Sequence, residues 1–279
     1  MNDRSDPGIT SLLISEARRA LHRRAVWVLI AVAVVGVALL GVIAYTDSAG
    51  RTVAELHVDG THPAVMADWW SVGGGDGILM IGAIPLLLGG LFGGATVAGA
   101  EWKAGTITTV LTWEPRRWRV HAARLAAAFS LAAVIALVLE TLFLAATLPA
   151  VLLNGTTAGT DAGWWFDLVG AGVRIALLTG AAAVIGASFA TIGRGTGFAL
   201  GLAFGWLSVG ENLVRGLKPS LQHLLLGDNL AIVLTWAPLE GASFTRSEVV
   251  ALITVTAYVA LLVAAGAVSF ARRDIAGAS

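Results

Sequence analysis

Six long apolar segments constrain the fold of this chain more than any other feature of its sequence. An α-helix needs about 20 residues to cross the roughly 30 Å hydrocarbon core of a bilayer, and each segment supplies about that number. Charged residues make up 13% of the chain and hydrophobic residues 57%, whereas about a quarter of a soluble domain is charged. The sequence predicts one all-α integral membrane domain over residues 1–279, with spans at about 26–45, 77–100, 125–153, 168–192, 196–213 and 249–270.

Several kinds of site are disfavoured by what the sequence contains. The chain has no cysteine, which excludes disulfides, thiolate metal ligands and a cysteine nucleophile. Its five histidines show no metal-binding spacing, and its net charge of zero argues against nucleic acid as a partner. No G-x-x-x-x-G-K-[ST] motif occurs, so this chain cannot form a P-loop for ATP.

The distribution of positive charge predicts the orientation in the membrane. With the N-terminus in the cytoplasm, 13 of the 18 Lys and Arg residues fall on the cytoplasmic side and 5 fall outside. Cytoplasmic loops of membrane proteins carry this excess of Lys and Arg. We expect a multi-pass protein of a prokaryotic plasma membrane, with both termini in the cytoplasm.

Residues 7–24 are expected to form an amphipathic helix before the first span. Its apolar residues recur at helical spacing on one face, which suits a helix lying in the inner headgroup layer. The alternative is a basic flank that only fixes topology. The charged candidates of this interfacial helix are Glu16, Arg18, Arg19 and Arg23.

Residues 101–124 join the second and third spans on the predicted cytoplasmic side. Gly105-Thr106 opens a short apolar-periodic run, and Pro115 then stops the helix because it has no backbone N–H to donate. The next residues are strongly basic, with Arg116, Arg117 and Arg119. Such a segment could dock a cytoplasmic partner, or its arginines could only bind lipid phosphate.

Residues 214–247 contain two apolar runs that are each too short to cross a membrane. Such runs are typical of re-entrant or interfacial helices that neighbouring protein protects. The sequence predicts a re-entrant hairpin before the last span, with its turn at Gly227-Asp228-Asn229.

In the 101–124 stretch, the chain resembles the membrane subunits of ABC transporters of the type-2 (ABC-2) permease family. The matching residues are Glu101, Gly105-Thr106, Leu111, Pro115 and Arg117, followed by Arg124 at the start of the third span. Family members often carry Lys at the last position, and a smaller, less charged turn than Trp113-Glu114 before the proline. The interfacial helix, the six spans and the re-entrant hairpin extend the resemblance over most of the chain.

The resemblance implies that residues 101–124 form a coupling helix seated in a separate ATPase subunit. It further implies a permease subunit of an ATP-driven exporter, assembled from two permease chains and two ATPase chains in membrane lipid. ATP and Mg would then be bound by the partner, and this chain would carry transport without being an enzyme. The spans, with few charges, favour a hydrophobic or amphipathic substrate such as a drug, a lipid or a natural product. The alternatives are a secondary transporter or channel without an ATPase, and a lipid-processing membrane enzyme.

Other side chains are candidates for the pathway or for the coupling contact. Glu140 is the acid deepest within a span, and such an acid either serves a proton or cation or holds two helices together. Glu211 and Asn212 end the fifth span, where the family resemblance places the pathway lining. Glu101 and Arg117 could bind the partner or each other. On that basis Glu101→Ala is expected to insert normally but to reduce substrate-stimulated ATP hydrolysis or to release the ATPase.

Overall fold

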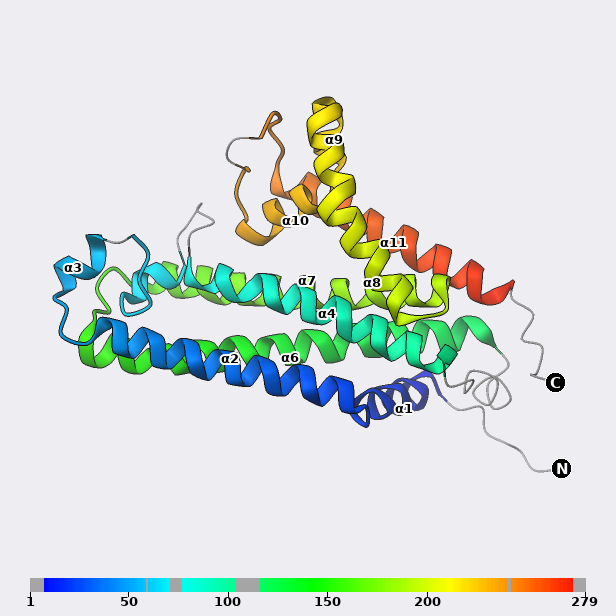
Figure 1. The fold of residues 1–279 in the computed structure, drawn as a ribbon, viewed down its shortest axis with the longest axis horizontal. Helices are drawn as coiled ribbons and strands as arrows, with labels where there is room; N and C mark the ends of the chain where they lie inside the picture. Colours follow the sequence, from blue (N-terminus) through cyan, green and yellow to red (C-terminus); the bar gives the residue numbers. More distant parts are fainter. Residues whose placement is uncertain (1–7, 59, 71–76, 104–115, 240–241, 273–279) are drawn as a thin grey trace.

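The computed structural model describes residues 8–58, 60–70, 77–103, 116–239 and 242–272 (Figure 1). Within these ranges it contains helices and no strand, apart from an isolated parallel bridge between Val65 and Thr156. Six of the described helices are long and apolar enough to cross a membrane: Arg24–Ser48, Ile78–Trp102, Arg117–Asn154, Ala162–Gly193, Thr196–Leu217 and Glu248–Ala271. The prediction of an all-α chain with six apolar spans is therefore confirmed.

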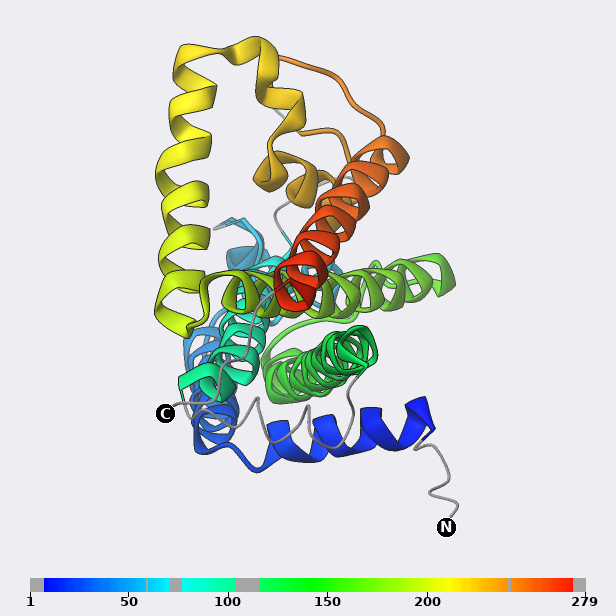
Figure 2. The same cartoon turned by 90° about the vertical axis from the view of Figure 1, so that its right-hand side faces the viewer.

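Four of the long helices run side by side as a lengthwise bundle (Figure 1), and α7 is the most buried of the four. Most of the apolar stretch of α7 is buried, whereas that of α2 is largely exposed. The bundle helices are α2 (Arg24–Ser48), α4 (Ile78–Lys103), α6 (Arg117–Asn154) and α7 (Ala162–Gly193). The remaining two long helices lean away from it, and Figure 2 shows α10 (Leu226–Thr235) in the space between them.

The two ends of the bundle differ in what covers them (Figure 1). At one end, here named the α1 end, α1 (Ile9–Leu21) lies beside the last turn of α4 and the first turns of α6. At the other, here named the α3 end, α3 (Val53–Val58) and the short 3₁₀ helix η1 (Met66–Trp69) cover the connection between α6 and α7. The spans predicted at 168–192 and 196–213 leave only three residues between them, and the structure has a tight turn there, because α7 ends at Gly193 and α8 begins at Thr196.

Small residues allow α4 and α7 to approach very closely. A Cβ atom at Gly90 would lie 2.4 Å from the Thr179 carbonyl oxygen, and one at Gly94 would lie 1.9 Å from the Ala183 carbonyl oxygen. From the other side, a Cβ at Gly186 would lie 2.1 Å from the Leu91 carbonyl oxygen. Helices in lipid associate through van der Waals packing rather than the hydrophobic effect, so these glycines are what brings the two backbones together.

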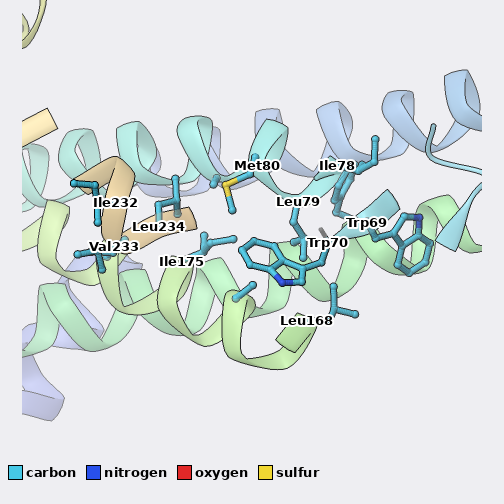
Figure 3. Close-up of a cluster of buried hydrophobic side chains, with 14 of the residues drawn as sticks. Trp69, Trp70, Ile78, Leu79, Met80, Leu168, Ile175, Ile232, Val233 and Leu234 are labelled. Atoms are coloured by element: carbon cyan, nitrogen blue, oxygen red, sulfur yellow. The ribbon is translucent and has the colours of Figure 1, made fainter. Parts of the chain in front are cut away.

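The largest group of buried apolar side chains lies toward the α3 end (Figure 3). Side chains from the η1 segment, the start of α4, α7 and α10 meet there, among them Trp70, Leu79, Ile175 and Ile232. The indole N–H of Trp164 donates to the Trp70 carbonyl at 3.0 Å, so this buried N–H group has a hydrogen-bond partner. This cluster fixes the α3 end to the bundle.

Several helix bounds differ from the predicted ranges. The third span extends toward the N-terminus to Arg117, so residues 117–124 belong to α6 rather than to a separate coupling segment. The predicted helix over 7–24 is divided, because α1 ends at Leu21 and α2 begins at Arg24. Hydropathy marks the length in contact with lipid, whereas a helix continues through any residue of good helix propensity, such as Arg and Ala. The predicted short helix after Gly105-Thr106 and the turn at Pro115 lie outside the described residues.

The stretch after the fifth span also differs from its prediction. α8 (Thr196–Gly205), a π-helical turn η2 (Trp206–Gly210) and α9 (Glu211–Leu217) form one continuous helix. A 3₁₀ helix η3 (Pro219–Leu224) then leads to α10. The predicted turn at Gly227-Asp228-Asn229 is wrong: these residues form the first helical turn of α10, where an aspartate suits the positive end of the helix dipole.

Candidate functional site

Five charged side chains meet at the α1 end, and we name them the charge cluster: Glu16, Arg19, Arg23, Glu101 and Arg124. The Glu101 carboxylate accepts a hydrogen bond from the Arg124 guanidinium. It also lies 3.5 Å from the guanidinium of Arg23 and 3.7 Å from that of Arg19. Arg19 in turn pairs with Glu16 at 3.0 Å. The cluster therefore joins α1, the α1–α2 connection, α4 and α6.

Both members of the central pair are buried: Glu101 is 4% exposed and Arg124 is 0% exposed. Glu101 lies in the last turn of α4, and Arg124 lies two turns into α6. α1 lies against them and presents Glu16 and Arg19 from one face, because residues three apart on a helix are neighbours. Buried charges persist in proteins only when they are paired, so this contact fixes the relative positions of the three helices.

Burial also alters the protonation of the cluster. It raises the pKa of the Glu16 carboxyl, against the opposing effect of Arg124, and nearby Glu101 raises it further. Burial lowers the pKa of the Arg23 guanidinium, while Glu101 opposes that change. Each shift disfavours the charged form of a group taken out of water.

The charge cluster contains more positive than negative groups. Three guanidinium groups face two carboxylates, and Glu16 is the carboxyl that burial makes easier to protonate. Within the described part of the chain, the buried atoms of the cluster without a hydrogen-bond partner are Oε2 of Glu16, Nε of Arg23, and Nε and Nη1 of Arg124. With three guanidinium groups to two carboxylates, the cluster is electropositive.

The coupling residues predicted from the sequence are distributed differently. Glu101 is buried inside the chain, and Arg117 donates to the carbonyls of Phe270 and Ala271 at 3.4 and 3.1 Å, at the end of α11. Of the two possibilities for Glu101 and Arg117, pairing with each other is not what the structure has, because α6 turns Arg124 rather than Arg117 toward Glu101. Arg119 is also buried, whereas Arg116 and Arg18 are exposed. Gly105, Thr106 and Pro115 lie outside the described residues.

Glu211 and Asn212 lie in a second polar network, near the start of α10. Glu211 is 1% exposed and accepts the backbone N–H of Gly227 at 3.0 Å. Arg215 bridges Glu211 at 3.3 Å and Asp228 at 3.2 Å from its Nε atom. Asn212 is exposed and bonds Ser208 and Arg215. In this structure the Glu211 carboxylate fastens α10 to α9.

Glu140 is buried on the face of α6 that meets α7. A Cβ atom at Gly172 of α7 would lie 3.0 Å from its Oε2 atom, and within the described ranges its Oε1 atom has no hydrogen-bond partner. The glycine at 172 leaves the space that this carboxyl fills. The acid is therefore placed at a helix–helix contact within the membrane-spanning part of α6.

Sequence reasoning missed the roles of Arg124 and Arg174. Arg124 had been recognised only as a basic residue at the start of a span, not as the buried partner of Glu101. The Arg174 guanidinium lies 5.3 Å from the Trp70 ring centre and 5.4 Å from that of Trp236, within the range of cation–π contacts. The available signal was that a charge inside a span must have a partner.

No group of three His, Asp or Glu side chains suited to a metal ion occurs in the part of the chain that the structure describes. No model of a known protein family matches the chain, and no curated protein matches it.

Proposed function

We propose that this chain is the permease subunit of an ATP-driven ABC exporter. It would form half of the pathway for a hydrophobic or amphipathic substrate, and a separate ATPase subunit would bind ATP and Mg. The observation that supports this most is the Glu101–Arg124 pair, which joins the helix entering the 104–115 segment to the helix leaving it. Because this ion pair fixes the end of α4 to the start of α6, the two helices are suited to move together with the segment that connects them.

The charge cluster suggests how force would pass from the ATPase to the spans. Closure of the ATPases would push on the 104–115 segment, and the pair of Glu101 with Arg124 would transmit that push to α4 and α6 together. Arg19 attaches α1 to the same carboxylate, and Arg23 attaches the α1–α2 connection, so α1 would move with them. Tight packing of α4 on α7 would then carry the movement to the centre of the bundle.

The rest of the proposal concerns the membrane and the assembly. α1 would lie in the inner headgroup layer, with both termini in the cytoplasm of a prokaryote. The stretch from α9 to α10 would re-enter the membrane from outside, protected by neighbouring helices. Two permease chains and two ATPase chains would form the complete exporter and alternate its access between the two sides.

Gly105→Leu is the variant that tests the coupling proposal. We expect it to reach the membrane at the wild-type level but to lose its ATPase, because a larger side chain obstructs close backbone approach. The measurement is co-elution with the proposed ATPase subunit, together with substrate-stimulated ATP hydrolysis. Gly36→Leu serves as the control, since a Cβ at Gly36 would meet no atom within 4 Å. Normal co-elution and turnover of Gly105→Leu would contradict the proposal.

The buried Glu140 carboxyl favours the alternative of an ion-driven secondary transporter, and Glu140→Gln tests it. We expect this variant to assemble and to transport close to the wild-type rate, because glutamine keeps the shape of the side chain that meets Gly172. The measurement is ATP-dependent uptake of substrate into inverted membrane vesicles. Loss of transport with intact assembly, or flux driven by an ion gradient without ATP, would instead favour the secondary transporter.

A further inference from the structure

An apolar groove of about 330 Å³ lies between α2, α4 and α6. Its walls come from residues 26–33 of α2, 85–97 of α4 and 128–139 of α6, with α7 at its floor. Thr179 is the single polar side chain of the lining, and its hydroxyl already donates to the Ile175 carbonyl at 2.8 Å. Leu29 and Val32 are exposed at the rim, so the groove opens on the surface that a bilayer would cover.

The groove exists because small residues of α4 face it and because α2 packs closely on α6 toward the α3 end. A Cβ atom at Gly89 or at Gly93 would meet no atom within 4 Å, although their neighbours Gly90 and Gly94 pack against α7. Toward the α3 end, α2 packs on α6 so closely that a Cβ at Gly41 would lie 2.6 Å from the Ala146 carbonyl oxygen. The space left beside α4 is apolar and open, which suits a hydrocarbon chain and excludes a polar ligand.

The groove leads directly to the charge cluster. Val26, which lines it, lies one helical turn from Arg23, and Val97 lies one turn from Glu101. Val26 and Val97 pack together with Ala20 of α1 at this end. The side chains of Arg19 and Arg23 are 39% and 21% exposed, so both are partly accessible from outside the chain.

We propose that the groove and the charge cluster together bind one anionic phospholipid, with an acyl chain along α4 and the phosphate beside Arg19 and Arg23. A guanidinium binds phosphate through two parallel hydrogen bonds, and the side chains of Arg19 and Arg23 are both partly exposed beside the groove. The cluster contains one guanidinium more than carboxylates, so a negative headgroup balances it and a zwitterionic one does not. Basic pockets between spans recognise anionic headgroups in this way. This site does not depend on the proposed transport function.

The test measures which lipid stays with the full-length chain after purification. The chain is incubated in detergent with equal amounts of phosphatidylglycerol and phosphatidylcholine, repurified, and the retained lipid is counted by mass spectrometry. We expect the wild type to retain phosphatidylglycerol in preference. Arg19→Gln and Arg23→Gln should each lower that preference about fivefold. Arg24→Gln is the matched control, because Arg24 is exposed beside the cluster.

A second set of variants separates the acyl chain from the headgroup. Gly93→Leu fills the groove and should reduce the retention of both lipids, whereas Gly36→Leu, on α2 outside the groove, should not. Gly89→Val repeats the test at a second open position, and gel filtration checks that each variant is folded. Equal retention of the two lipids by the wild type would overturn the headgroup assignment. Undiminished retention by the folded groove variants would overturn the groove.

Discussion

Glu101→Ala is expected to reduce the amount of folded protein severely, because it leaves the fully buried Arg124 without the carboxylate that neutralises it. Removing one partner of a buried ion pair costs about 3–5 kcal/mol. Many proteins are stable by only about 5–15 kcal/mol, so this is a large share of the total. The measurement is the thermal unfolding midpoint of the detergent-purified chain, with the yield of monodisperse protein as a second readout.

Two further variants show whether the loss of stability in Glu101→Ala comes from the unpaired charge of Arg124. The double variant Glu101→Leu with Arg124→Met should recover much of the stability, because replacing a buried pair by apolar side chains is often neutral. Arg18→Ala removes an exposed charge from α1 and should change the midpoint little. A Glu101→Ala chain as stable as the wild type would show that the pair is not structural. It would also restore the expectation from the sequence that this variant inserts normally.

Gly94→Ala is expected to have the second large effect, because its Cβ atom would lie 1.9 Å from the Ala183 carbonyl oxygen. The contact involves backbone atoms, so no side chain can rotate away and the helices α4 and α7 must separate. Overpacking of this kind costs about 1–3 kcal/mol, and a clash with backbone belongs at the upper end. The thermal unfolding midpoint of the purified variant measures the cost.

The neighbouring glycine provides the matched control. Gly93→Ala makes the same chemical change one residue away, where a Cβ would meet nothing within 4 Å. Alanine is the better helix former by up to about 1 kcal/mol, so Gly93→Ala should be neutral or slightly stabilising. If the two variants shifted the midpoint equally, the close packing of α4 on α7 would not be what stabilises the bundle.

The sequence indicated most of the charge cluster but divided it between two sites. Glu16, Arg19 and Arg23 belonged to the expected interfacial helix, and Glu101 to the expected coupling segment. The structure brings them onto one carboxylate together with Arg124. Which of several arginines meets Glu101 depends on the rotation of α6 about its axis. The third span was predicted to begin at about residue 125, so Arg124 lay just outside it and the sequence did not indicate that this arginine is buried. Glu211 was predicted to line a pathway because the sequence did not show that its hydrogen-bond partner lies in α10.

The sequence by itself determined the helical class and the six apolar spans, because transfer of a segment from water to lipid depends on its local composition. The tight turn between α7 and α8 followed equally from the three residues that separate the spans predicted at 168–192 and 196–213. The tertiary structure alone decided that Arg124 is buried against Glu101, that Gly94 meets Ala183 and that an open groove separates α2 from α4. Inside lipid every face of a span is apolar, so hydropathy no longer marks the face that packs. Close contacts of small residues and pairing of the few charges select that face instead.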